Sequence, residues 1–104
     1  MEFKAGERLR MVRELMDLTQ KEFAQETGLN ATRIKNLEQF KVRVSELEYD
    51  AVAETYPELV AFFAHEGLIS ENRLRTSSNP RVRLIMSLLD AGDLAENKAI
   101  RWIK

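Results

Sequence analysis

Cysteine is absent from this 104-residue chain, and only four glycines, two prolines and one histidine occur in it. The lack of cysteine excludes a disulfide framework and a thiolate metal site. The scarcity of glycine and proline favours helices, because few residues interrupt them. No apolar run approaches the length of about 18 residues that a membrane-spanning helix needs, and we find no secretory leader. By elimination we expect a cytoplasmic protein without membrane contact.

Catalytic and cofactor motifs are also missing from the sequence. It has no pair of histidines, no glycine-rich phosphate loop and no serine next to a suitable base. The single histidine, His65, is expected at a helix end, where its charge would complement the helix dipole. We therefore expect no enzymatic activity, no cofactor and no metal site.

The charges are unevenly distributed along a chain whose net charge is −1. Residues 1–43 contain nine Lys or Arg against seven Asp or Glu, a balance of +2. Residues 44–69 contain six Asp or Glu and no Lys or Arg, a balance of −6, and residues 70–104 contain seven basic against four acidic residues, a balance of +3. The first segment can therefore face a polyanion if the acidic segment turns away from it.

The segment 19–39, TQKEFAQETGLNATRIKNLEQ, is typical of two short helices joined at a glycine. Thr19 and Glu22 have the spacing of a capping box at the start of the first helix. Gly28 stands where this helix must end, a position that favours a left-handed backbone. Asn30 can then cap a second helix. The pattern predicts a helix-turn-helix.

The second of these helices has one apolar and one polar face. Ile34 and Leu37 fall on the first, whereas Thr32, Arg33 and Asn36 fall on the second. These polar side chains can read base edges or bind phosphates, so the pattern indicates DNA binding. An ordinary structural bundle with a solvated polar face is the alternative.

Helical periodicity continues on both sides of this motif. In the first helix we expect the apolar stripe to be buried and Arg8 to be in solvent. Ser45 and Glu48 have the spacing of a second capping box, and Pro57 is a favoured first residue of a helix that Gly67 ends. The sequence predicts an all-α, compact five-helix bundle over residues 1–69, with helices at about 4–17, 20–27, 31–40, 46–55 and 57–66.

The remaining residues are expected to form an extension of this bundle. The polar, turn-rich segment 70–79 is predicted to be a linker, and 80–104 a helical extension that begins at Pro80. Asp93 and Glu96 have the spacing to cap a last short helix. Two such short amphipathic helices need a surface to pack on, either the first domain or a second copy of the chain. For the second case the candidate dimer contacts are Ile85, Met86, Leu89, Ile100, Trp102 and Ile103.

The run from Gly6 to Glu38 resembles the lambda-repressor-like helix-turn-helix family of phage Cro and CI repressors and xenobiotic-response-element regulators. The resemblance is carried by Arg-x-x-x-x-Leu-Thr-Gln from Arg13 to Gln20, by Glu-Phe-Ala-Gln at 22–25, by Gly28, and by Ile34 and Leu37-Glu38. It covers about a third of the chain at motif strength. It implies a five-helix DNA-binding domain whose second motif helix enters the major groove.

The resemblance also implies roles for individual residues. Arg13 and Glu38 match a pair that forms an ion pair between helices near the DNA backbone. Asn36 suits adenine, and Arg33 suits guanine or a phosphate. The implied base contacts are Ala31, Thr32, Arg33 and Asn36. The implied phosphate contacts are Gln20 and Asn30. From their position or charge we also expect phosphate contacts at Thr19, Lys35, Lys41 and Arg43.

The chain departs from the family pattern at Phe40, where relatives usually carry the glycine that ends the recognition helix. A bulky residue tolerates the left-handed conformation poorly. The substitution therefore predicts either a longer helix or a different loop after Glu38.

Two functions follow as hypotheses from these observations. The first is a sequence-specific, DNA-binding transcriptional regulator, in its simplest form a repressor, that binds a palindromic operator as a homodimer. The alternative is a protein-interaction module (an antitoxin, anti-activator or phage accessory factor) that binds a partner through the acidic face 44–69 or the tail 70–104.

Overall fold

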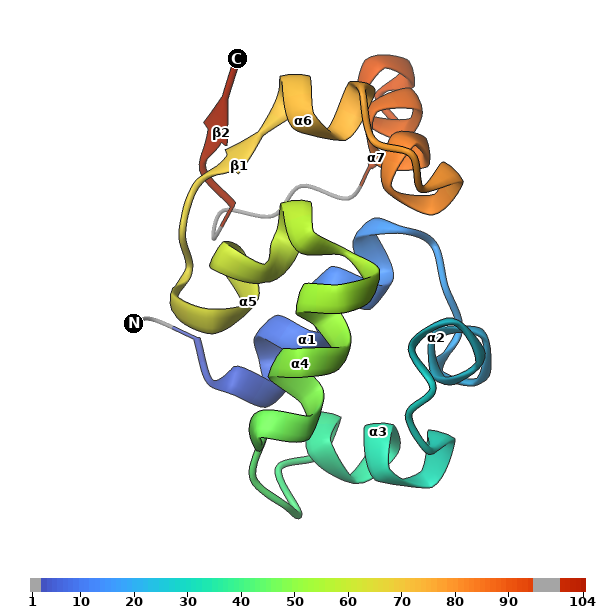
Figure 1. Ribbon diagram of the computed structural model, residues 1–104, viewed down its shortest axis with the longest axis vertical. Coiled ribbons are helices and arrows are strands. Elements are labelled where there is room, and N and C mark those ends of the chain that lie inside the picture. Colours follow the sequence, from blue (N-terminus) through green and yellow to red (C-terminus); the bar gives the residue numbers. More distant parts are fainter. Residues whose placement is uncertain (1–2, 95–99) are drawn as a thin grey trace.

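The computed structural model describes residues 3–94 and 100–104, which fold into a mainly helical bundle (Figure 1). The predicted all-α class is confirmed for this part of the chain, apart from two strands of two residues each. None of the described helices is both long and apolar enough to cross a membrane. In chain order the elements are α1 Ala5–Leu15, α2 Gln20–Thr27, α3 Ala31–Glu38, α4 Glu46–Thr55, the 3-10 helix η1 Pro57–Leu59, α5 Val60–His65, β1 Ile69–Ser70, α6 Glu71–Arg75, α7 Pro80–Ala91 and β2 Trp102–Ile103.

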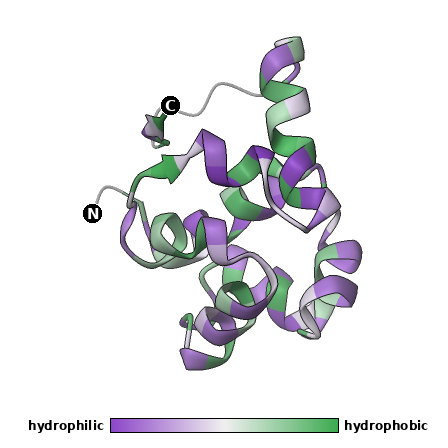
Figure 2. Cartoon of the chain, turned by 45° about the horizontal axis from the view of Figure 1, so that its top comes forward, coloured by the Kyte–Doolittle hydropathy of each residue, from purple (hydrophilic) through white to green (hydrophobic). Residues whose placement is uncertain are grey.

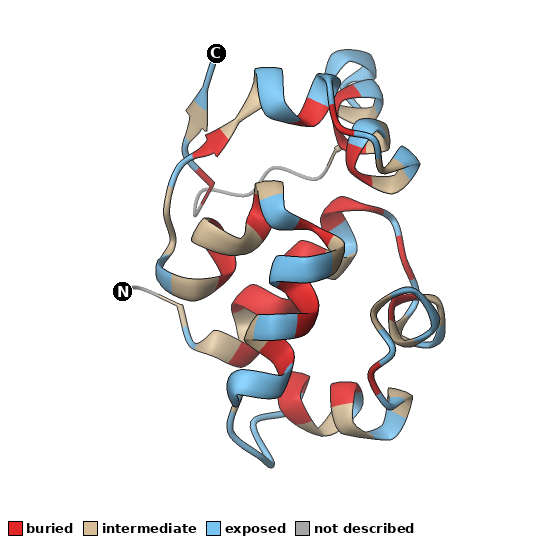
Figure 3. Ribbon diagram, in the orientation of Figure 1, coloured by how far each residue is buried: buried red, intermediate tan, exposed pale blue. Residues whose placement is uncertain are grey.

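The core forms where α1 packs against α3 and α5 and where α4 packs against α2 and α5 (Figure 3). Leu9 and Val12 of α1 are fully buried, as the helical spacing predicted. Tyr56, after α4, is also fully buried and stacks on Phe23 of α2 with 5.8 Å between the ring centroids. Its hydroxyl donates a hydrogen bond of 2.7 Å to Glu26. Burial, with this hydrogen bond, raises the pKa of Tyr56 above its ordinary value.

Arg8 is buried, and the expectation that it lies in solvent is wrong. Only 2 % of the residue is exposed. Its guanidinium donates from Nε to the Phe63 carbonyl at 2.6 Å, from one terminal nitrogen to Ala64 at 3.3 Å, and from the other to the carbonyl of Phe3. The side chain thus closes the carboxyl end of α5, where helix carbonyls lack partners and carry partial negative charge.

The helix-turn-helix forms as its local signals predicted. Thr19 and Glu22 make both hydrogen bonds of the capping box at the start of α2. Gly28 ends α2 in the left-handed conformation, with φ of 76°. Asn30 caps α3 by accepting a hydrogen bond of 3.1 Å from the Arg33 amide. The turn is therefore fixed by residues that act within three or four positions of one another.

At Phe40 the structure has a different loop after Glu38 and not a longer helix. α3 ends at Glu38 rather than near residue 40, and Phe40 itself adopts the left-handed conformation with φ of 62°. This backbone costs a bulky residue about 1–2 kcal/mol. The Phe40 and Lys41 amides donate to the carbonyls of Leu37 and Asn36, so the last turn of α3 is closed despite the strain.

The prediction that segment 70–79 is a linker is wrong, because the segment contains a helix and packs on the bundle. α6 occupies residues 71–75, and its Leu74 is fully buried. Ser77 donates to Glu58 at 3.1 Å, and the Asn79 amide group donates to the Thr55 carbonyl at 3.1 Å. One apolar residue and a few side-chain hydrogen bonds are sufficient to hold this polar segment against the bundle.

The helix α7 begins at Pro80, as predicted, and packs on its own chain. Hydrophobic and hydrophilic residues alternate along it (Figure 2). Val82 and Ile85 are fully buried, mainly against the α6 region. Arg81 links α7 to α2 through Glu26 at 3.0 Å and Glu22 at 3.5 Å.

This packing corrects the predicted set of dimer contacts. Ile85, Met86 and Ile100 are 0 %, 2 % and 7 % exposed, so the chain itself has already covered them. Because the apolar face of α7 is buried within its own chain, the helix does not need a second copy to cover that face. Of the same set, Leu89 and Trp102 are partly buried and Ile103 is 45 % exposed.

The predicted last helix is wrong at residues 102–103, which form β2. This strand pairs in parallel with β1, with Ile69 opposite Trp102 and Ser70 opposite Ile103. Isoleucine and tryptophan favour extended backbone once a partner strand is present. The proposed cap residue Glu96 lies outside the described residues.

Candidate nucleic-acid interface

The helix α3 and the loop after it lie at one end of the molecule, and the β1–β2 pair and α6 lie at the other (Figure 1). Ile34 and Leu37 turn into the core, with 0 % and 1 % exposure. Thr32 and Lys35 are exposed, and Asn36 is half-buried. Ala31 is also half-buried, so all predicted base contacts on α3 except Arg33 remain accessible without an assigned structural partner among the described residues.

Three of the predicted phosphate contacts hold helix ends. The Thr19 hydroxyl accepts from the Glu22 amide at 3.1 Å, and Asn30 caps α3. The Gln20 amide group donates to Glu38 at 3.2 Å. These bonds fix where α2 and α3 begin, and phosphate contact by the same residues stays a prediction.

Arg13 and Glu38 form the ion pair that the resemblance implied. The Arg13 guanidinium donates from Nε and a terminal nitrogen to the two Glu38 oxygens at 2.9 and 2.8 Å. It also donates to the Leu18 carbonyl at 2.9 Å. The hydrogen bond with Glu38 raises the pKa of Arg13. With Gln20, this pair joins the end of α1, the start of α2 and the end of α3, and so orients the motif.

Arg33 is turned toward α4 rather than outward. Its guanidinium donates to the two oxygens of Glu48 at 2.8 and 3.0 Å and to the Ser45 hydroxyl at 3.3 Å. The Glu48 side chain has no exposed surface. Sequence reasoning assigned Arg33 to base contacts and Glu48 only to a capping box, and it missed their pairing. The sequence held a signal for this pairing: Glu48 falls on the buried side of α4, and a buried charge needs a partner.

The environment of Glu48 favours its ionised form. Burial alone raises the pKa of a carboxyl, but hydrogen bonds from Arg33 and from the Ser45 amide and hydroxyl outweigh burial. The pKa of Glu48 therefore lies below its ordinary value of 4.5. A folded-state pKa below the unfolded value means that ionised Glu48 stabilises the fold above pH 4.5, and that this contribution is lost as the pH falls through the lowered pKa.

Replacing Glu48 with glutamine should reduce the free energy of unfolding by about 1–2 kcal/mol at pH 7, because hydrogen bonds to a charged acceptor become neutral ones. Urea unfolding at pH 7 and at pH 3 measures the difference. We expect it to shrink at pH 3, below the ordinary value of 4.5, because the carboxyl of the unfolded chain is then protonated. Glu46→Gln, at an exposed position two residues earlier, is the control and should change stability little at either pH. An equal loss for Glu48→Gln at both pH values would contradict the role of its charge.

Three exposed cations lie on α3 and on the loop that follows it. Lys35, Lys41 and Arg43 are exposed and form no ion pair within the described residues. Other exposed arginines do form ion pairs, such as Arg10 with Glu14 and Arg75 with Asp90. The end that carries α3 therefore offers uncompensated positive charge beside polar side chains.

No family model matches the chain, and no curated protein or solved structure is significantly similar to it. The assignment of this surface therefore depends on its own geometry and on the motif in the sequence.

Proposed function

We propose that the protein is a sequence-specific DNA-binding regulator, in its simplest form a repressor, and that α3 enters the major groove. The observation that carries this proposal is the presentation of α3. A capped helix, a left-handed turn at Gly28 and a second capped helix hold Thr32 and Asn36 outward beside unpaired Lys35, Lys41 and Arg43. Amide and hydroxyl groups read base edges, and unpaired cations bind phosphates.

The position of Arg33 narrows the set of base contacts that we propose. Because Glu48 and Ser45 hold its guanidinium against α4, Arg33 orients α3 rather than reading a base. Specificity is then assigned to Ala31, Thr32 and Asn36. The methyl groups of Ala31 and Thr32 and the amide of Asn36 favour a site in which thymine methyls and an adenine are read.

A single α3 reads only a few base pairs, so we propose that the regulator binds as a homodimer on a palindromic operator. The tail contacts to be tested are the ones that remain accessible, Leu89, Trp102 and Ile103. The alternative, a protein-interaction module, is favoured by one observation: Leu47 is 58 % exposed on the acidic helix α4. A stoichiometric partner without a selected DNA consensus would favour that alternative.

Selection of bound sequences from a random DNA pool at low salt tests the proposed function. We expect a consensus with two-fold symmetry and a half-site spacing of about one helical turn. A mass of two chains in solution should accompany it. Recovery of no consensus, from protein whose fold is verified by circular dichroism, overturns sequence-specific DNA binding.

Replacing Asn36 with alanine should relax the selected consensus at one base pair in each half-site. We expect a loss of about 5- to 150-fold in affinity for the selected operator, and little loss on random DNA, because a bidentate amide contact discriminates by about 1–3 kcal/mol. Binding titrations with both DNAs measure the ratio. Gln20→Ala is the comparison, since a phosphate contact should weaken both DNAs alike. Equal losses on both DNAs for Asn36→Ala would exclude it as a base contact.

A further inference from the structure

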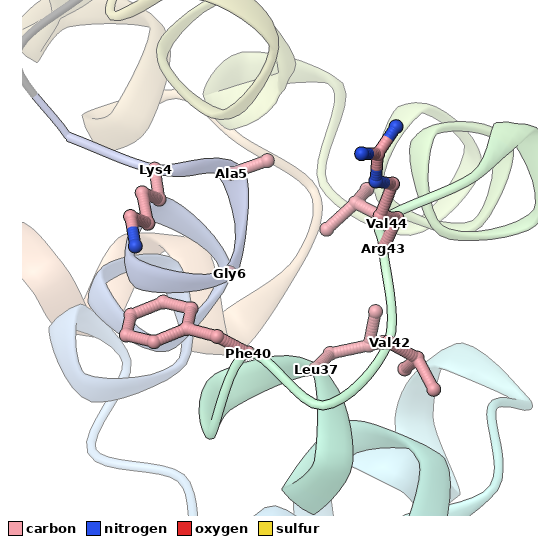
Figure 4. Close-up of a pocket in the computed structure, with 8 residues that line it drawn as sticks. All are labelled: Lys4, Ala5, Gly6, Leu37, Phe40, Val42, Arg43 and Val44. Atoms are coloured by element: carbon pink, nitrogen blue, oxygen red, sulfur yellow. The ribbon is translucent and has the colours of Figure 1, made fainter.

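A pocket of about 310 Å³ lies between the start of α1 and the loop that follows α3 (Figure 4). Lys4, Ala5 and Gly6 form one side, and Leu37 lies at the end of α3. The loop supplies the other side with Phe40, Val42, Arg43 and Val44. This volume is in the range of pockets that bind small molecules.

The backbone is tightly constrained on two sides of this pocket. A side chain at Gly6 would place its Cβ 2.3 Å from the Leu37 carbonyl oxygen, so the backbones of α1 and α3 approach as closely as glycine permits. Phe40 is strained by its left-handed backbone, with φ of 62°. That backbone lays its ring under Lys4, whose ammonium is 4.7 Å from the ring centroid. Strained residues of this kind concentrate at binding sites.

The lining has a definite chemical character. Most of it is apolar, and Phe40 and Val42 are 50 % and 39 % exposed. Both charged residues that line the pocket among the described residues, Lys4 and Arg43, are cations. Neither cation forms an ion pair in the part of the chain that the structure describes. An occupant should therefore combine an apolar body with one negative charge.

We propose that this pocket binds a small monocarboxylate with an apolar body. The body would contact Leu37, Phe40 and Val44, and the carboxylate would pair with Arg43, whose guanidinium lies apart from the Lys4 ammonium (Figure 4). A carboxylate suits the guanidinium of Arg43, which binds it through two parallel hydrogen bonds. A phosphate dianion suits the pocket less well, because the apolar walls offer little to replace its hydration.

Binding in this pocket would also regulate DNA binding by α3. This regulation rests on the proposed function, whereas binding of the carboxylate does not. The loop holds Lys41 and Arg43, and it follows directly on the end of α3 at Glu38. A carboxylate that pairs with Arg43 removes a phosphate contact. We therefore expect occupancy of the pocket to weaken DNA binding.

Titration of the isotopically labelled full chain with sodium benzoate, followed by amide chemical shifts at constant ionic strength and without DNA, tests the pocket. We expect saturable shifts at Gly6, Leu37, Phe40 and Val44, with a dissociation constant on the order of a millimolar for so small a probe. Benzyl alcohol should bind several-fold more weakly, and inorganic phosphate should give no saturable shift at the apolar residues. An absence of saturation with benzoate, or equal binding of phosphate, overturns the proposal.

Two variants locate the binding. Arg43→Gln should weaken benzoate binding by about two- to fivefold, as expected for one partly exposed charge pair, without changing the binding of benzyl alcohol. Ala5→Leu should fill the pocket and abolish binding, whereas Ala53→Leu, on the exposed side of α4, is the matched control. Unchanged binding by both Ala5→Leu and Arg43→Gln excludes this pocket. Because no DNA is present, a failure here is distinct from a failure of DNA binding.

Discussion

Replacing Arg8 with methionine should destabilise the protein by about 2–4 kcal/mol, because three carbonyls lose their donors within a buried site. Those carbonyls belong to Phe3, Phe63 and Ala64, and Arg8 is 2 % exposed. Methionine keeps most of the length and apolar bulk of the side chain, so the loss reports the hydrogen bonds rather than a cavity. For a domain of this size it corresponds to a fall of roughly 10–25 °C in the unfolding temperature.

Thermal and urea unfolding, followed by circular dichroism, measure this loss. Arg10→Met is the matched control, because Arg10 lies in the same helix, half-exposed, and pairs only with Glu14 four residues later. It should change the free energy of unfolding by less than about 0.5 kcal/mol. Arg8→Lys keeps the charge but not the planar fork of donors, and it should fall between the two. Equal effects of the Arg8→Met and Arg10→Met replacements would contradict the structural role of Arg8.

Arg8 also shows where sequence reasoning reaches its limit. Helical periodicity placed it outside the apolar stripe of α1, and an arginine there is usually solvated. Its partners lie 55 and 56 residues away, at the carboxyl end of α5. No pattern within a single helix contains that information, because the contact depends on how two distant helices pack.

The features that the sequence predicted well are those determined within a few residues. Thr19 with Glu22 and Ser45 with Glu48 form their capping boxes, and Gly28 adopts the left-handed turn. The apolar faces of α1, α3 and α7 are buried as their spacing predicted. Each depends on the backbone geometry of one helix or one turn, which nearby residues specify.

The candidate site was predicted in position but not in all of its pairings. The Arg13–Glu38 pair came from a motif in which the two residues recur together. Arg33 was assigned from its place on α3 alone, and its partner Glu48 belongs to the next helix. The direction of the Arg33 side chain is decided by a partner on another helix, and this cannot be known from one helix.

The tail was predicted least well because its structure depends on the rest of the chain. Short helices and two-residue strands have little stability of their own. β2 exists because β1 lies beside it, and α6 because Leu74 reaches the core. The sequence signals for residues 71–75 and 102–103 are weak in isolation, and packing overrides them.

Neutralising the three unpaired cations near α3 should reduce DNA affinity roughly a hundredfold or more and lower the salt dependence. In the variant Lys35→Gln, Lys41→Gln, Arg43→Gln, each lost phosphate contact should reduce the slope of log affinity against log salt concentration by about 0.9. The slope should thus fall by nearly three, on operator and random DNA alike. Fluorescence anisotropy at several salt concentrations measures it. The unfolding temperature should change little, because all three side chains are exposed.

A control with the same change in net charge separates local contact from overall electrostatics. Arg73, Arg101 and Lys104 are exposed as well, and α6 and the C-terminal end lie opposite α3 (Figure 1). Replacing these three with glutamine should change the slope by less than one. An effect of net charge alone would instead give the two variants equal slopes. Screening within about 10 Å at 0.1 M salt limits such an effect, so we expect the slopes to differ. Equal slopes would place the DNA elsewhere on the surface and so exclude α3 as the element that enters the groove.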